Sequence, residues 1–426
     1  MKDTFFKSTL ILLIGGALTK MLGMIIKIIM TRTVGVDSVS LYMLVFPTFS
    51  LFMTIAQLGF PTAISKIIAE DTHNNKKVIL SIIPISIMFN SLLIILIYFI
   101  SPYISSLLND NRTYLPILSI ALVLPFDSLS SILRGYFFGK QNMLPHILSL
   151  LTEQIVRLLL IIFFIPSIMY KGIVITVSFL ILINVISEFL STIVLLLFIK
   201  NKIINKHDLK PDKKEISNVF SIAIPTTLSR LVGSISYFFE PIIITTLLLS
   251  KYDLNYIVSE YGIIEGYVLP LLLLPSFLSG AISGSLIPDI SKKYAKKDIL
   301  GIKRRIKQVI KISLFLGVSI SLILFINPKI FLNLIFRIDK GTTYIKVLSP
   351  FFIVLYLQYP LESVLQALNK SKDIMKNNII GVSLKLFTIF VFSFLNIGLY
   401  NLIIAIIVNI LITTYLHYKK IKETLY

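Results

Sequence analysis

Two basic residues lie inside apolar segments of this chain, at matching places in a repeated pattern. ALTKMLG, over residues 17–23, contains Lys20, and TLSRLVG, over residues 227–233, contains Arg230. A charge in apolar surroundings is costly unless it is paired, hydrated or used to hold a ligand. Lys27 follows Lys20 by seven residues and therefore shares its helix face. We interpret the three cations as candidates for binding an anionic substrate in a central cavity.

A second interpretation of Lys20 and Lys27 stays open. The apolar segments over residues 8–31 and 39–61 contain no acid, so any ion pair must come from a distant part of the chain. Such a remote partner would be one of the acids in other apolar segments, namely Glu188, Glu240, Glu265 or Glu362.

Other ionisable residues are spaced so that they can pair along a single helix. Glu153 and Arg157 are four residues apart. Asp127 and Arg134 are seven apart and share one face. We interpret these four residues as ion pairs or as parts of a conformational switch.

Polar side chains recur at helical spacing in two apolar segments: Gln358, Glu362 and Gln366 in one, and Asn184, Glu188 and Ser191 in the other. Such stripes satisfy one another across helices or contact a substrate. We predict that Glu362 and Gln366 line the central cavity and that Glu188 joins the ion-pair network.

The sequence shows no sign of enzyme chemistry. It has no cysteine, and its four histidines are isolated. It also lacks a GxxxxGK phosphate loop, an HExxH pair and a dinucleotide-binding glycine pattern. We expect no catalytic residue, no metal site and no cofactor, so that transport would be driven by a coupling ion or by the membrane potential.

The segments that must position these residues are hydrophobic helices. Of the 426 residues, 56% are hydrophobic, and apolar runs of about 20 residues recur along the chain. In lipid every backbone group must be satisfied within its own segment, so the runs predict helices. We predict an all-α polytopic membrane protein with about twelve spans: 8–31, 39–61, 78–100, 115–138, 146–169, 173–199, 216–248, 261–288, 309–328, 346–368, 377–396 and 399–416.

The basic residues predict the orientation of these spans. The net charge is +20, and most of the lysines and arginines between spans fall on the side that carries both termini. This bias predicts cytoplasmic termini, and it accounts for the charge without nucleic acid as a partner. The isoleucine-, lysine- and asparagine-rich composition hints at an AT-rich bacterial genome, so the expected location is the plasma membrane of a bacterium. The basic segment 292–311 predicts a helix that lies at the cytoplasmic membrane surface before the ninth span.

Weak internal similarity predicts two halves. The segment around Lys20 matches that around Arg230, and residues 114–135 resemble residues 344–367. We predict two pseudo-symmetric six-helix lobes with a site between them, as in many transporters. The predicted parts are an N-terminal lobe, a basic cytoplasmic linker and a C-terminal lobe, over residues 1–199, 200–215 and 216–426.

Two longer segments resemble known families. RGYFFGKQNMLPHILSLLTEQIVR, residues 134–157, closely resembles the signature of the SpoVB-like polysaccharide biosynthesis proteins. LPSFLSGAISGSLIPDISKKYAKKD, residues 274–298, resembles that group and the MurJ lipid II flippases. Both belong to the multidrug/oligosaccharidyl-lipid/polysaccharide (MOP) exporter superfamily. The resemblance implies a MATE- and MurJ-like two-lobed fold, alternating access, and a substrate-binding role for Lys20 within Thr19-Lys20-x-x-Gly23.

The sequence departs from the MurJ pattern in two respects. The segment FPTFSLFMTIAQLG, residues 46–59, lacks the arginine that MurJ-like proteins carry in their second helix. Twelve spans are predicted where many SpoVB and MurJ proteins have fourteen, so the pair that supports a lipid-tail groove in MurJ is expected to be missing.

The resemblance implies a flippase for an undecaprenyl-pyrophosphate-linked saccharide, such as the peptidoglycan precursor lipid II, with a role in the spore cortex. The implied partners are the lipid-linked saccharide, the bilayer and cell-wall synthesis proteins. Two alternatives stay open. One is Na⁺- or H⁺-coupled multidrug efflux, which needs an acid-rich site, and the other is a non-transporting scaffold for cell-wall assembly.

Overall fold

The computed structural model describes residues 2–70, 75–199 and 212–425. They form two compact units, Met1–Phe238 and Phe239–Tyr426. All regular structure in the described residues is helical, which confirms the predicted all-α class.

Eleven helices in the described part of the chain are long and apolar enough to cross a membrane. The first, Ile14–Ala69, contains residues 14–31 of the predicted span 8–31 and all of the predicted span 39–61. Each of the other predicted spans has its own helix. The predicted span 261–288 is the least accurate, because the membrane-length helix there is Leu254–Leu273 and a separate helix follows it.

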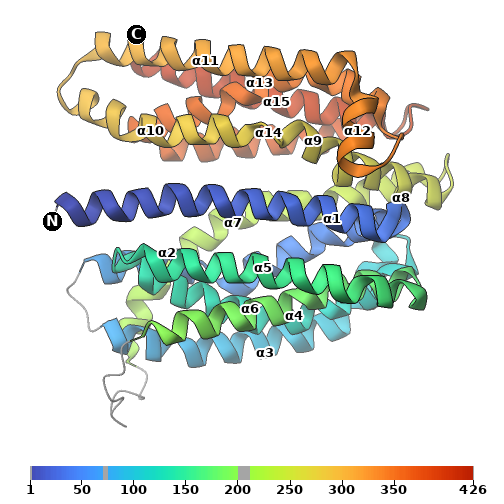
Figure 1. The fold of residues 1–426 in the computed structure, drawn as a ribbon, viewed down its shortest axis with the longest axis horizontal. Coiled ribbons are helices and arrows are strands. Elements are labelled where there is room, and N and C mark those ends of the chain that lie inside the picture. Colours follow the sequence, from blue (N-terminus) through green and yellow to red (C-terminus); the bar gives the residue numbers. More distant parts are fainter. Residues whose placement is uncertain (1, 71–74, 200–211, 426) are drawn as a thin grey trace. The chain divides into compact units, whose positions relative to one another are not determined.

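The first unit is built from six helices and the beginning of a seventh (Figure 1). Their bounds are α1 Lys2–Gln57, α2 Phe60–Ala69, α3 Asn75–Leu107, α4 Tyr114–Gly139, α5 Met143–Ile168, α6 Ile173–Leu197 and α7 Lys213–Leu248. Two single turns, η1 and η2, cover Asn111–Thr113 and Met169–Lys171. In this unit α4 packs against α3 and α6, and α5 packs against α1 and α6.

The second unit contains the end of α7 and the remaining helices. Their bounds are α8 Leu254–Ile263, the π-helix η4 Ile264–Val268, α9 Leu269–Leu273, α10 Ser276–Ala295, α11 Ile299–Ile326, α12 Pro328–Phe336, α13 Thr342–Ala367, α14 Ser371–Phe392 and α15 Tyr400–Leu425. Here α13 packs against α10, α11 and α15, and α14 packs against α15.

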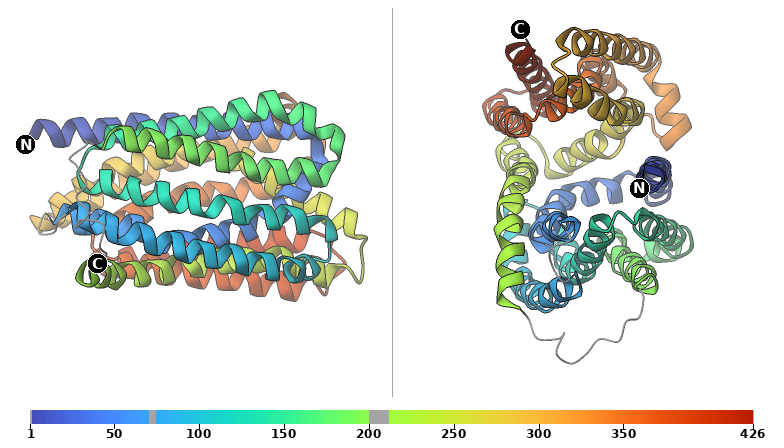
Figure 2. Two further views of the ribbon diagram at one scale, coloured as in Figure 1. Left: turned by 90° about the horizontal axis from the view of Figure 1, so that it is seen from below. Right: turned by 90° about the vertical axis from the view of Figure 1, so that its left-hand side faces the viewer.

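The two units repeat one packing scheme internally. In the first, α4 lies between α3 and α6, and α5 covers α6. In the second, α13 lies between α11 and α15, and α14 covers α15. Within each unit the long helices run side by side with roughly aligned axes (Figures 1 and 2). This correspondence agrees with the sequence match between residues 114–135 of α4 and 344–367 of α13.

The division between the units falls inside α7, between Phe238 and Phe239, whereas the sequence predicted a linker at residues 200–215. Residues 200–211 of that linker lie outside the described residues. The physical reason for the later division is packing. Val219 and Ala223 of α7 are buried in one apolar cluster with residues of α2, α3 and α4, so the first half of α7 belongs to the first unit.

An ion pair at the start of α7 also ties it to this unit. Lys77 Nζ of α3 lies 2.7 Å from Asp212 Oδ2. The hydrogen bond from Lys77 lowers the pKa of the Asp212 carboxyl below its usual value, because it favours the charged form.

The prediction for the basic segment 292–311 is wrong. It does not form one surface helix. Instead α10 ends at Ala295, and α11 begins at Ile299 and continues to Ile326 as a membrane-length helix. Asp298 caps α11 by accepting a hydrogen bond from the backbone N–H of Gly301 at 2.8 Å. This cap starts a new helix within the segment.

Candidate functional site

The site begins at a break between α1 and α2. Leu58 and Gly59 both adopt left-handed backbone conformations, with φ of 46° and 61°, so the helix ends at Gln57 and restarts at Phe60. A Cβ atom on Gly59 would lie 2.7 Å from the carbonyl oxygen of Ala223 on α7. The break and this close approach both require glycine. They hold Gln57 against α7.

Gln57 joins α7 to α4 through its side-chain amide. Its Oε1 accepts a hydrogen bond from Arg230 Nη2 at 2.9 Å, and its Nε2 donates to Asp127 Oδ2 at 2.8 Å. Asp127 is only 4% exposed, whereas Arg230 is exposed. One neutral side chain therefore stands between a buried carboxylate and an accessible guanidinium.

The polar contacts continue from Asp127 into the interior of the unit. Ser130, one turn further along α4, donates to Glu188 Oε2 of α6 at 2.6 Å and lies 3.0 Å from the carbonyl oxygen of Asp127. Glu188 is 4% exposed. A carboxylate buried to this degree must be paired or hydrogen-bonded.

Arg134 supplies the charge that Glu188 needs. Its Nη2 lies 2.9 Å from Glu153 Oε2, 3.1 Å from Glu188 Oε2 and 2.8 Å from Ser191 Oγ. Arg157 Nη2 lies 2.6 Å from the other oxygen of Glu153. Two guanidinium groups and two carboxylates thus balance each other on three helices, α4, α5 and α6.

Of the two pairs predicted from spacing, the structure contains one. Glu153 and Arg157 form the pair that their spacing predicted. Asp127 and Arg134 do not pair directly, because Asp127 accepts from Gln57 while Arg134 turns to the two glutamates. The polar stripe of α6 satisfies its neighbours across helices, since Glu188 and Ser191 both bind Arg134.

Lys20 and Lys27 lie on α1 in the same unit. Lys20 is exposed, and its side chain makes no hydrogen bond or ion pair with any described residue. A Cβ atom on Gly16 of the same stripe would meet nothing within 4 Å, while one on Gly23 would lie 3.8 Å from Gln154 Oε1 of α5. Lys27 is half-buried and does have an interaction partner.

Arg230 falls within Met1–Phe238, the contact unit that also contains Lys20. The remaining predicted site residues, Glu362 and Gln366, belong to α13 of the second unit. Gln366 is exposed and Glu362 is half-buried.

The second unit holds a buried ion pair that the sequence analysis missed. Lys385 Nζ of α14 lies 2.5 Å from Glu240 Oε2 of α7, and Glu265 of the π-helix acts electrostatically on the same lysine. Lys385 is a cation inside an apolar segment, which is the signal that identified Lys20. Gln57 and Ser130 were also missed, because a single uncharged side chain gives no such signal.

No group of three or more metal-binding side chains occurs among the residues that the structure describes. The charged groups of this arrangement are the exposed cations Arg230 and Lys20 and the buried carboxylates paired with Arg134 and Arg157.

Comparison with known proteins places this arrangement in a class. The family model described as "Polysaccharide biosynthesis protein" matches residues 5–294, and the MatE model matches residues 241–391. Stage V sporulation protein B of Bacillus subtilis (strain 168) is 34% identical over the whole chain and 85% of its own length. Lipid II flippase MurJ of the same organism is 23% identical over 91% of the chain and 77% of its own length.

A solved structure agrees with the fold. The inward-facing conformation of a multidrug resistance MATE family transporter of the MOP superfamily superposes with a TM-score of 0.73. It covers 96% of this chain and 94% of its own, at 15% identity. Fold and relatives together define a multi-pass membrane transporter of the MOP superfamily rather than an enzyme. Within that superfamily the chain belongs to the polysaccharide biosynthesis protein family.

Proposed function

We propose that the chain is a flippase that moves an undecaprenyl-pyrophosphate-linked saccharide, such as a peptidoglycan precursor, across the cytoplasmic membrane by alternating access. The observation that carries the proposal is the state of Arg230. Its guanidinium is exposed and donates to the neutral amide of Gln57 rather than to a carboxylate. A guanidinium in this state is available to bind phosphate oxygens through two parallel hydrogen bonds.

The charge distribution of the first unit supports an anionic cargo. Glu153 and Glu188 are occupied by Arg134 and Arg157 in the interior. Arg230 and Lys20 of the same unit are exposed cations. A site for cationic drugs needs accessible acids instead, whereas the nearest one, Asp127, is buried behind Gln57.

The relatives support the nature of the cargo. One has the name lipid II flippase, and another has the name stage V sporulation protein B. The proposal therefore includes a peptidoglycan precursor as cargo, a role in the spore cortex, and cell-wall synthesis proteins as partners. It also includes the cytoplasmic location of both termini, which rests on the distribution of basic residues.

The proposal is tested in liposomes that contain the purified protein and fluorescent lipid II. An added membrane-impermeant reagent reports how much lipid II reaches the outer leaflet. We expect Arg230→Ala and Lys20→Ala to slow movement at least tenfold, because a hydrogen bond to a charged group contributes about 1.5–3 kcal/mol. Lys296→Ala, which removes an exposed cation between α10 and α11, is the matched control and should leave the rate unchanged.

A further variant tests the state of Arg230 directly. Gln57→Glu keeps the shape of the side chain and puts a carboxylate beside the guanidinium. We expect it to slow lipid II movement, because the cation would then be neutralised within the protein.

Each alternative has its own result. An absence of lipid II movement, beside an active flippase in the same assay, contradicts the proposed cargo. Drug extrusion driven by a Na⁺ or H⁺ gradient in these vesicles supports multidrug efflux. Full function of the Lys20→Ala, Arg230→Ala double variant in cells supports a scaffold.

A further inference from the structure

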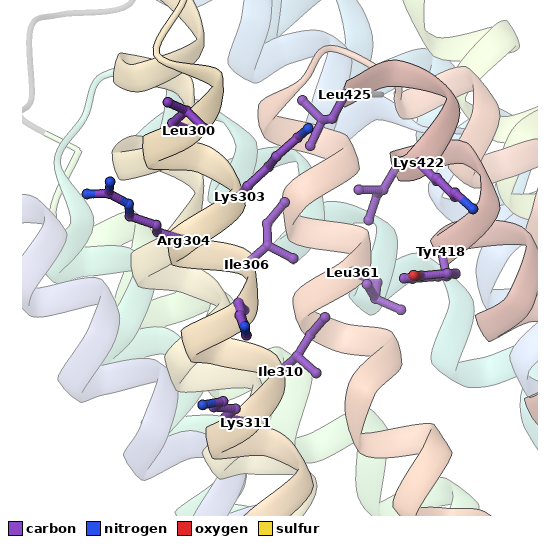
Figure 3. A pocket seen from close by; sticks show the side chains of 12 residues that line it. Leu300, Lys303, Arg304, Ile306, Ile310, Lys311, Leu361, Tyr418, Lys422 and Leu425 are labelled. Atoms are coloured by element: carbon purple, nitrogen blue, oxygen red, sulfur yellow. The ribbon is translucent and has the colours of Figure 1, made fainter.

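A pocket of about 520 Å³ lies between α11, α13 and α15 (Figure 3). All three helices belong to the second unit. None of the residues discussed for the candidate site lines this pocket, which we call the α11–α15 pocket.

Five basic residues line the α11–α15 pocket, and no acidic residue does: Lys303, Arg304, Lys307, Lys311 and Lys422. Lys303, Lys307 and Lys311 follow each other at intervals of four, so they form one stripe along α11. At 1.5 Å per residue this stripe extends over about 12 Å. The pocket therefore carries a column of positive charge at the basic end of a membrane-length helix.

The acids nearby neutralise other cations. Asp289 of α10 pairs with Lys293, and its second oxygen lies 3.2 Å from Arg305 Nε. Asp373 of α14 lies 3.1 Å from Lys420 Nζ. None of these three cations lines the pocket, so these acids leave the charge of the lining residues Arg304, Lys307, Lys311 and Lys422 in place. Lys303 has an interaction partner of its own.

The floor of the pocket is apolar. Leu361 of α13 and Ile421 of α15 are buried, at 3% and 4% exposure. They belong to the apolar core of the second unit. Figure 3 shows Ile306 and Ile310 pointing from α11 into the pocket, with Tyr418 on the opposite wall. A ligand that fits this lining has an anionic head and an apolar body.

We propose that the α11–α15 pocket binds an anionic glycerophospholipid of the surrounding membrane, with its phosphate among the lysines and an acyl chain over the apolar floor. Basic pockets between membrane helices bind anionic headgroups in this way. A free phosphate would use only the cations and leave the apolar floor uncovered. Long lysine side chains on such a helix keep their stems in contact with apolar groups while their heads reach the interface.

The test measures lipid binding to the delipidated full-length protein by native mass spectrometry, with phosphatidylglycerol and phosphatidylcholine as probes. The pocket variant carries Lys303→Gln, Lys307→Gln and Lys422→Gln. The control carries Lys292→Gln, Lys296→Gln and Lys419→Gln, three exposed lysines outside the lining. We expect phosphatidylglycerol affinity to fall roughly 10- to 100-fold in the pocket variant and to be unchanged in the control.

Three outcomes overturn the proposal. If the pocket variant and the control lose the same phosphatidylglycerol affinity, binding depends on the total positive charge and not on the pocket. Equal binding of phosphatidylcholine and phosphatidylglycerol by the parent protein removes the headgroup argument. Displacement of the lipid by glycerol 3-phosphate at matched concentration shows that the apolar floor contributes nothing.

A second variant covers the case in which the triple substitution prevents folding. Ile310→Trp keeps every cation and fills the space over the floor. It should reduce phosphatidylglycerol binding at least tenfold, and unchanged binding contradicts the proposal. Lipid II is the last probe. If it binds here in preference to phosphatidylglycerol, the pocket serves the cargo, and the phospholipid assignment is wrong.

Discussion

Arg134 is the residue on which the buried charge network depends. One nitrogen of its guanidinium contacts Glu153, Glu188 and Ser191, on two different helices. The side chain is 14% exposed, and those of the two glutamates are 8% and 5% exposed. A lysine carries the same charge but lacks the planar, many-donor geometry that this position uses.

Removing Arg134 should therefore destabilise the protein strongly. We expect Arg134→Met to lower the free energy of unfolding by about 3–5 kcal/mol, because it leaves the buried Glu188 carboxylate without a cation and Glu153 with Arg157 alone. Arg134→Lys should fall between this variant and the parent. Thermal unfolding of the detergent-solubilised protein measures the change.

Arg305→Met provides the comparison. Arg305 pairs with Asp289, and both side chains are more than a third exposed, at 41% and 34%. Such pairs contribute about 0–1 kcal/mol. Equal destabilisation by the two substitutions would mean that the burial of the Arg134 network is not what stabilises it.

At this scale the sequence predicted charged residues better than neutral ones. The spacing of Glu153 and Arg157 was enough to predict their pair, since both lie on one helix. The partners of Asp127 and Arg134 come from other helices, and their choice depends on packing that the spacing does not contain. Gln57 is uncharged, so only the helix break beside it shows why it is positioned between Asp127 and Arg230.

The element that most depends on backbone conformation is α1. It continues from Lys2 to Gln57, but Gly35 within it has φ 76° and ψ 171°. Only glycine adopts this conformation readily. The sequence predicted two spans here, and the structure keeps them as two helical segments joined at this residue.

Gly35→Ala tests the kink. A Cβ atom at this position would meet nothing within 4 Å, so any cost comes from the backbone alone. We expect a loss of about 1–3 kcal/mol in the free energy of unfolding, read from thermal unfolding in detergent. Gly233→Ala is the matched control, since that glycine also has open space around it and lies within the regular helix α7. If the two variants unfold alike, the Gly35 conformation is not a constraint.

Elements of uniform apolar character were predicted well, and elements with mixed signals were not. The spans of α3 to α6 correspond to long apolar runs with polar connectors. Segment 292–311 is basic with periodic isoleucines, which is typical of a surface helix. The cap at Asp298 and the continuous apolar run after Lys311 make its second half the start of a membrane helix instead.

At the scale of the whole molecule, the proposed cargo makes transport sensitive to voltage. An inside-negative potential favours outward movement of a negative charge by about 2.3 kcal/mol per charge per 100 mV. We expect lipid II movement in proteoliposomes to accelerate when the leaflet that holds the labelled headgroups faces a negative compartment. A potassium gradient with valinomycin sets the potential, and reversing the gradient should slow movement. A rate that is the same at both signs contradicts a voltage-driven mechanism.

The contact division inside α7 and the predicted linker at residues 200–215 fall at different places in the chain, and the predicted bounds of the two lobes stay a prediction. The basic segment 200–215 is a polar interruption, and such interruptions are the usual sequence sign of a boundary. The contact boundary lies later in the chain, because Val219 and Ala223 of α7 are buried against α2 and neighbouring helices. Arg230 then belongs to the same unit as Lys20, which the matching motifs could not indicate.

The order of residues in the buried network also has a consequence for synthesis of the chain. Arg134, Glu153, Arg157 and Glu188 find all their ionic partners within residues 134–188. As the ribosome delivers α4, α5 and α6 in turn, each buried charge meets its counter-charge before any later segment exists. Arg230 is made only after these partners are complete, when Glu153 and Glu188 already have their cations. In the folded protein Arg230 therefore donates to the neutral Gln57 side chain and not to the acids that precede it in the chain.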